Sequence, residues 1–168
     1  MIAHLRRKGF SLVEMLVYIS ILVLMLAVIM NIIVSVIRSE RVLKALRNVE
    51  DSAVLSLERI TREVRQAENV DINSSIFDLN PGRLALESTD ALGNPRTVEF
   101  YLSSGVLMFS ENGVELGALT RTDARVSALT FRFFTGSNSK GIRTEITIES
   151  GTSTHYRSDN FYSSAILR

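Results

Sequence analysis

The chain has 168 residues, which is enough for one domain with a modest core. It contains no cysteine, so disulfide bonds and thiolate chemistry are excluded. The formal net charge is +1, but without three cations near the N-terminus, Arg6, Arg7 and Lys8, it becomes −2, which disfavours nucleic acid as a partner.

An apolar segment, Met15 to Ile37, follows the first glutamate of the chain. Its length of about 23 residues corresponds to roughly 34 Å of helix, and the hydrocarbon layer of a bilayer is about 30 Å thick. A soluble helix of this length would show a polar face, and a secretory signal peptide would have a shorter apolar region and a small-residue cleavage site. We therefore predict a membrane span.

Glu14 stands at the start of this segment and has two interpretations. In the first, Ser11 is the N-cap of the helix and Glu14 completes a capping box, with Phe10 and Met15 as the hydrophobic staple. In the second, cleavage after Gly9 leaves Phe10 with a cationic amine, and Glu14 supplies the counter-charge in a low-dielectric setting. The two interpretations are compatible.

The stretch "RRKGFSLVEMLVYISIL" resembles the N-terminal signature of type IV prepilins and of the pseudopilins of type II secretion, without a gap from Arg6 to Glu14. The resemblance implies that a membrane prepilin peptidase cuts between Gly9 and Phe10 and methylates the new Phe10 amine. It also implies that Glu14 pairs with the Phe10 amine of a neighbouring subunit in a filament. Many major pilins have a proline in the apolar run, where this chain has Asn31 and no proline. We therefore expect a continuous helix, in which Asn31 hydrogen-bonds to a neighbouring helix.

An amphipathic helix is predicted over residues 38–69, after the span over 10–37. Its apolar stripe has a spacing of three and four residues. The stripe consists of Val42, Leu46, Val49, Ala53, Leu57, Ile60, Val64 and Ala67. Charged residues occupy the other faces, and we expect most of them to be solvated. They are Arg41, Lys44, Arg47, Glu50, Asp51, Glu58, Arg59, Arg62, Glu63 and Arg65. A coiled coil or the chain's own sheet would cover the stripe.

Residues 70–168 change to a period of two, which is typical of strands. The predicted strands are Arg83–Ser88, Thr97–Ser103, Gly105–Ser110, Val126–Thr135 and Ile142–Ser150. Glu111–Gly113 is a hairpin signal, and "GSNSKG", Pro81-Gly82 and Gly93-Asn94-Pro95 mark turns or loops. We predict an α+β, pilin-like fold, in which a long N-terminal helix packs on a C-terminal antiparallel sheet.

Catalytic and metal-binding patterns are weak. Ser153, His155 and Asp159 lack the strand–turn–helix context of a nucleophile. The oxygen-rich segment Asp71–Asn80 lacks the glycine and the terminal glutamate of a calcium loop. We predict no enzyme, no cofactor and no metal site.

The distal part of the chain resembles W-type minor pilins and J-type pseudopilins in the order of its elements, from "LERITREVRQAENV" to the final "FYSSAILR". The resemblance implies a minor pilin or pseudopilin, a structural subunit of a pilus, type II secretion or DNA-uptake filament. Its partners would be prepilin peptidase, other subunits, an assembly platform and the membrane. After removal of the leader, residues 1–9, the chain would cross the inner membrane once, with its globular part outside the cytoplasm, and then enter the filament. The alternative is an anchored binding or adhesion module that never polymerises. The processing signature favours the subunit, since an anchor needs no cleavage site.

Overall fold

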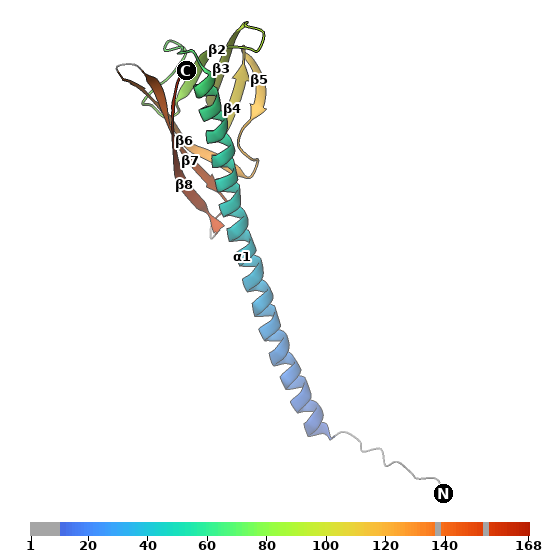
Figure 1. Ribbon diagram of the computed structural model, residues 1–168. Coiled ribbons are helices and arrows are strands. Elements are labelled where there is room, and N and C mark those ends of the chain that lie inside the picture. Colours follow the sequence, from blue (N-terminus) through green and yellow to red (C-terminus); the bar gives the residue numbers. More distant parts are fainter. Residues whose placement is uncertain (1–10, 137–138, 153–154) are drawn as a thin grey trace. The chain divides into compact units, whose positions relative to one another are not determined.

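The computed structural model describes residues 11–136, 139–152 and 155–168 (Figure 1). The chain divides into two compact units, residues 1–40 and 41–168, of which the first is described from residue 11. Helix α1 (Leu12–Gln66) begins in the first unit and ends in the second. Antiparallel strands follow it, which confirms the predicted α+β fold.

The described part of the first unit is helical and exposed. Every residue from Ser11 to Glu40 is exposed, and the helix has no break, as the absence of proline predicts. Within the described residues, α1 is the one helix long and apolar enough to cross a membrane, with a mean hydropathy of 2.8 over an 18-residue window of which 0 % is buried. An apolar surface of this extent is suited to lipid rather than to water.

The second unit begins with the rest of α1, whose apolar stripe is buried as predicted. Val49, Ile60 and Val64 are at most 1 % exposed. Ser52 and Ser56 are also fully buried on this face, where small side chains let neighbouring backbone come close. The Ser52 hydroxyl accepts a hydrogen bond of 3.3 Å from the backbone N–H of Arg121.

A five-stranded antiparallel sheet follows in chain order. Its strands are β1 (Asn69–Val70), β2 (Arg83–Thr89), β3 (Pro95–Ser103), β4 (Val106–Glu111) and β5 (Val114–Ala118). The turn between β4 and β5 confirms the predicted hairpin. Its central residues, Asn112 and Gly113, have φ angles of 50° and 77°, as expected of a type I′ turn.

A second sheet has three strands, β6 (Ala124–Thr135), β7 (Lys140–Ser150) and β8 (Arg157–Ile166). Along β7, Ile142, Thr144, Ile146 and Ile148 are buried, and the residues between them are exposed or half-buried. This alternation confirms the orientation predicted from the sequence. The predicted turn "GSNSKG" joins β6 to β7, although its residues 137 and 138 lie outside the described residues.

The loop over residues 76–82 lies along the edge of β6 that β7 leaves unpaired. The Asp78 N–H donates to the Phe131 carbonyl at 2.9 Å, and the Gly82 N–H donates to the Leu129 carbonyl at 2.8 Å. The Asn80 side-chain oxygen accepts from the Leu129 N–H at 3.0 Å. The loop therefore provides hydrogen-bond partners for backbone groups on this edge of β6, which would otherwise be open to pairing with other strands.

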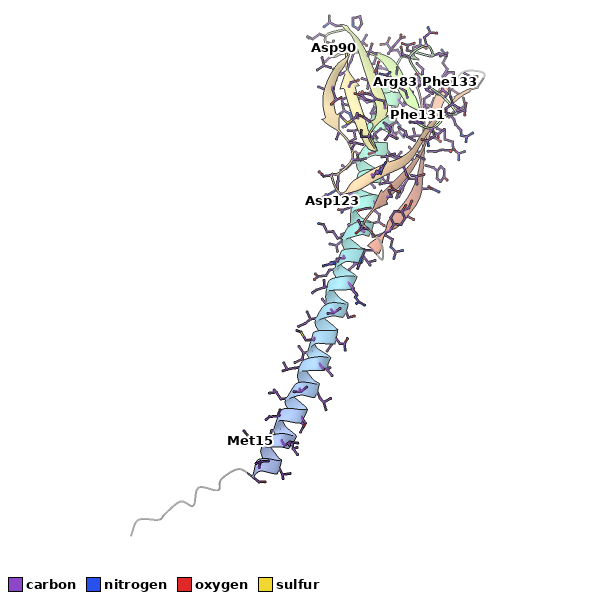
Figure 2. All side chains as sticks on the ribbon, turned by 180° about the vertical axis from the view of Figure 1, so that it is seen from behind. Met15, Arg83, Asp90, Asp123, Phe131 and Phe133 are labelled. Carbon is purple, nitrogen blue, oxygen red and sulfur yellow. The ribbon has the colours of Figure 1, made fainter. Side chains whose placement is uncertain are left out.

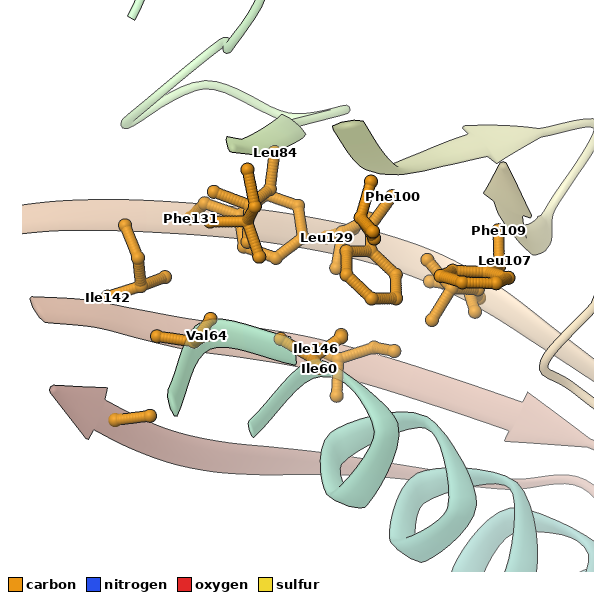
Figure 3. Close-up of a cluster of buried hydrophobic side chains, with 14 of the residues drawn as sticks. Ile60, Val64, Leu84, Phe100, Leu107, Phe109, Leu129, Phe131, Ile142 and Ile146 are labelled. Atoms are coloured by element: carbon orange, nitrogen blue, oxygen red, sulfur yellow. The ribbon is translucent and has the colours of Figure 1, made fainter. Parts of the chain in front are cut away.

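One hydrophobic core joins α1 to both sheets. Figure 3 shows Ile60 and Val64 of α1 in the same cluster as side chains from β2, β3, β4, β6 and β7. Phe100 and Phe131 are the largest fully buried members. The chain's own strands therefore cover the helix stripe, and no coiled-coil partner is needed for it.

The architecture differs from the prediction in three respects. Two sheets form instead of one, because the 76–82 loop occupies the edge of β6 that would have continued the sheet. Helix α1 ends at Gln66, before residue 69, because Asn69 and Val70 pair with β2. Strands β1, β5 and β8 were not predicted.

Glu63 is an exception to the expectation that most charged residues of this helix are solvated. Its side chain is only 4 % exposed, and its carboxylate lies 2.9 Å from both the Arg59 and the Arg96 guanidinium. Arg96 reaches Glu111 at 2.9 Å as well. The charge is tolerated in the interior because two guanidinium groups satisfy it.

Candidate processing and assembly site

The predicted cleavage junction and basic leader lie outside the described residues. Gly9, Phe10 and the cations Arg6, Arg7 and Lys8 therefore stay predictions from the sequence. The described part of the site begins at Ser11, directly after Phe10.

Ser11 caps the N-terminus of α1, as predicted. Its hydroxyl accepts a hydrogen bond of 3.2 Å from the Val13 N–H, and its carbonyl accepts one of 3.1 Å from the Met15 N–H. A serine cap satisfies one of the backbone donors that the first helical turn leaves unpaired. The start of the helix is thus fixed by a residue that directly follows the predicted junction.

Glu14 is the third residue of α1 and is exposed. The Tyr18 hydroxyl, one turn along the helix, donates to its carboxylate at 3.3 Å. Among the described residues Glu14 makes no bond back to the Ser11 N–H, so only the serine half of the capping box is formed. The carboxylate also complements the positive end of the helix dipole.

Tyr18 is the part of the site that the sequence reasoning missed. Its spacing of four residues from Glu14 places the two side chains on one face of a helix, which is the signal that predicts the contact.

The helix beyond Tyr18 presents mostly apolar side chains. Ser20 donates its hydroxyl to the Leu16 carbonyl at 2.8 Å, so its polar group is satisfied within the helix. A shallow apolar groove of about 280 Å³ follows, lined by five side chains. These are Ile21, Leu24, Met25, Val28 and Ile29. Asn31 is exposed further along.

The oxygen-rich loop after β1 uses its side chains for internal bonds. Hydrogen bonding from the Ser74 side chain and backbone holds the pKa of Asp71 below its usual range. Asp78 lies 3.7 Å from Arg132, and Asn80 bonds to Leu129. Among the described residues, no three His, Cys, Asp or Glu side chains gather to hold a metal ion.

The histidine considered for catalysis lies before β8. The His155 N–H donates to the Thr152 carbonyl at 3.1 Å. Asp159 is an exposed residue of β8, and Ser153 lies outside the described residues. The described positions of His155 and Asp159 therefore add no support for the Ser153-His155-Asp159 arrangement considered from the sequence.

Comparison with known proteins gives one match. The prokaryotic N-terminal methylation motif matches residues 4–30, a stretch that contains the predicted junction, Glu14 and most of the apolar segment. No curated protein and no solved structure matches the chain. The motif implies processing by a prepilin peptidase and assembly with other pilin subunits. Together with the helix-and-sheet fold, it supports a type IV pilin-like prepilin.

Proposed function

We propose that the chain is a minor pilin or pseudopilin, a structural subunit of a filament that serves a pilus, a type II secretion system or a DNA-uptake machine. The methylation motif at residues 4–30 carries the proposal. The α1 span and the second unit, which has a hydrophobic core of its own, support it, since a subunit needs both a polymerising helix and a globular domain.

In the proposed maturation, prepilin peptidase cleaves between Gly9 and Phe10 and methylates the Phe10 amine. The basic residues Arg6, Arg7 and Lys8 are removed with the leader on the cytoplasmic side. The second unit then lies outside the cytoplasm, and α1 is the single span until the assembly platform passes the subunit into the filament.

Glu14 is proposed to receive the Phe10 amine of the neighbouring subunit. Opposite unit charges about 4 Å apart attract by roughly 4 kcal/mol at an effective dielectric of 20, before desolvation is subtracted. Tyr18 supports this role, because its hydrogen bond orients the Glu14 carboxylate along the helix. The Ser11 cap leaves Glu14 available, because the serine caps the helix without a bond from Glu14.

The finer assignment, to W-type minor pilins or J-type pseudopilins, rests on the order of elements. A long helix leads into consecutive antiparallel strands, and the final "FYSSAILR" supplies most of β8, which closes the second sheet. The proposed role as a structural subunit does not require a catalytic site.

Two measurements test the proposal. Mass analysis of the chain extracted from membranes that contain a prepilin peptidase is expected to show Phe10 as a methylated N-terminus. A chain that still begins at Met1 would contradict the proposed processing.

The second measurement is co-purification of the Glu14→Gln variant with its partner subunits. Cleavage and membrane insertion should survive, because the junction is unchanged and a neutral residue enters the bilayer more cheaply. Assembly should fail, because the neighbouring amine loses its counter-charge. Glu40→Gln is the matched control, since Glu40 is an exposed glutamate of the same helix beyond the predicted span. Assembly of the Glu14 variant at the control's level would instead favour the capping interpretation and leave Glu14 without an assembly role.

A further inference from the structure

A pocket of about 570 Å³ opens at one end of the second unit. Arg41 and Lys44 of α1 line one side, and the start of β6, the end of β7 and the described residues Gly151, Thr152, His155 and Tyr156 line most of the rest. Asp123, labelled in Figure 2, lies in its wall, at the end of the unit opposite the β2–β3 turn at Asp90. The pocket is therefore built by segments far apart in the sequence.

Cations outnumber acids in the wall of this pocket. Arg41 makes no ion pair with any described residue. Lys44 lies 3.5 Å from Asp123, with side chains that are 72 % and 60 % exposed. Arg125 lies 4.0 Å from Glu149, with side chains that are 71 % and 24 % exposed. Both cations are largely exposed, and ion pairs of exposed cations contribute little stability, so both can also face an added anion.

The pocket lies close in sequence to the predicted span. Arg41 follows Ile37, the last apolar residue of the segment, by four positions, which is about one turn of α1. Tyr156 also lines the pocket and is half exposed, with its hydroxyl bonded to Glu149 at 2.8 Å. A tyrosine with one apolar and one hydrogen-bonded end is typical of the headgroup layer of a membrane.

We propose that this pocket binds the phosphate headgroup of an anionic phospholipid, in the leaflet next to the second unit. The pocket volume is sufficient for a headgroup, and Arg41, Lys44 and Arg125 supply the positive charge. A lipid fits better than a soluble anion because Arg41 follows the last apolar residue of the predicted span by only four positions of one continuous helix, which keeps it close to the headgroup layer. The binding requires the span but not the filament, so it goes beyond the proposed function. It would hold the subunit against the membrane before assembly.

The test uses the full chain in nanodiscs of phosphatidylcholine and phosphatidylglycerol, with native mass spectrometry of the lipids retained after release into detergent. The parent is expected to retain phosphatidylglycerol in preference to phosphatidylcholine. Arg41→Gln and Lys44→Gln should each reduce that retention about fivefold, the loss expected for one juxtamembrane cation. Asp123→Asn should raise it by a similar factor, because it removes an acid beside Lys44.

Two control variants distinguish binding in the pocket from general electrostatic attraction between cationic side chains and anionic lipids. Arg38→Gln removes an exposed cation nearer to the span that does not line the pocket, and Arg65→Gln removes one near the other end of the helix. Both variants should retain phosphatidylglycerol like the parent. Melting temperatures check that each variant is folded.

Three results would overturn the proposal. One is equal loss in the Arg38 and Arg41 variants, which would show that charge near the membrane acts without the pocket. Another is unchanged retention in the Arg41, Lys44 and Asp123 variants. The third is loss of the lipid preference when inorganic phosphate is added, which would show that the pocket takes the free anion.

Discussion

The buried carboxylate of Glu63 allows a sharp test of the packing between α1 and the five-stranded sheet. It accepts hydrogen bonds from the Arg96 guanidinium at 2.9 and 3.5 Å, and Arg59 lies 2.9 Å away on the same helix. Glu63→Gln keeps the shape of the side chain but removes its charge. Arg96 would then keep Glu111 as its partner, while Arg59 would lose its only described carboxylate.

The expected loss of stability follows from the burial of the group. Removal of one partner from a buried ion pair costs about 3–5 kcal/mol. Arg59 is 29 % exposed and can turn toward water, so we expect the low end, about 3 kcal/mol. For a chain of this size that corresponds to a decrease in Tm of roughly 6–12 °C. The double variant Glu63→Gln/Arg96→Gln should lose less than the sum of the single losses, with a coupling of about 1–3 kcal/mol.

Thermal and urea unfolding of a fragment that starts at Arg38, followed by circular dichroism, measures these losses. Glu58→Gln is the matched control, because Glu58 is an exposed glutamate of the same helix without an ion pair among the described residues. It should melt like the parent. If Glu63→Gln also melts like the parent, the ion pairs contribute nothing and the reasoning is wrong.

Three further predictions concern the second unit. The fragment that starts at Arg38 should be soluble and folded without detergent. Ile60→Asp should unfold it, since an unpaired buried charge costs several kcal/mol against a total stability of about 5–15 kcal/mol. An unchanged melting temperature in this variant would contradict the packing of Ile60 in the core. Hydrogen bonds from Arg96 lower the pKa of Glu111 in the folded chain. The ionised carboxylate therefore stabilises the fold at any pH above the pKa that Glu111 has in the unfolded chain, about 4.3. This stabilisation is lost as the pH falls from there toward the lower pKa of the folded chain. Arg96→Gln should flatten that part of the stability–pH curve, and an unaltered slope would refute the assignment. Gly141→Ala should destabilise by about 1–3 kcal/mol in urea unfolding, because a Cβ there would meet the Phe134 ring and would lie 2.8 Å from the Ala165 carbonyl oxygen. Gly136→Ala has more room, so an equal loss in that variant would show that the contacts with Phe134 and Ala165 are not the cause.

The predictable parts of the fold are those in which one face is buried at a regular spacing. The stripe from Val42 to Ala67 and the alternation along β7 both have this form, and both were read correctly. Strand β8 was missed because its residues are mostly polar and exposed, so alternation is weak. The Asn112-Gly113 turn was predictable from the sequence, because Asn-Gly is one of the few residue pairs that readily adopt positive φ angles at both positions.

Contacts between distant segments were not predictable. Glu63 has the spacing of a solvated residue. Of the two guanidinium groups that satisfy its buried carboxylate, Arg59 is close in sequence, but Arg96 is brought beside it only by β3. The division into two sheets depends on the 76–82 loop lying along β6, which no local pattern indicates. At the candidate site, the Ser11 cap follows from sequence, and the Tyr18 contact follows from spacing alone.

The order of the strands has a consequence for how the chain acquires its structure. In both sheets every strand pairs with its neighbour in sequence, β1 through β5 and then β6 through β8. Pairings between sequence neighbours close short loops, so they lose little entropy and form rapidly. A chain synthesised from its N-terminus can therefore form each hairpin as soon as both of its strands are present. Strand β8 and the residues after it also bond to α1 and its end, through Thr61 with Ser163 at 2.8 Å and the Arg168 N–H with the Ala67 carbonyl at 3.2 Å. These two contacts join segments about 100 residues apart in sequence, so they can form only after β8 has been synthesised.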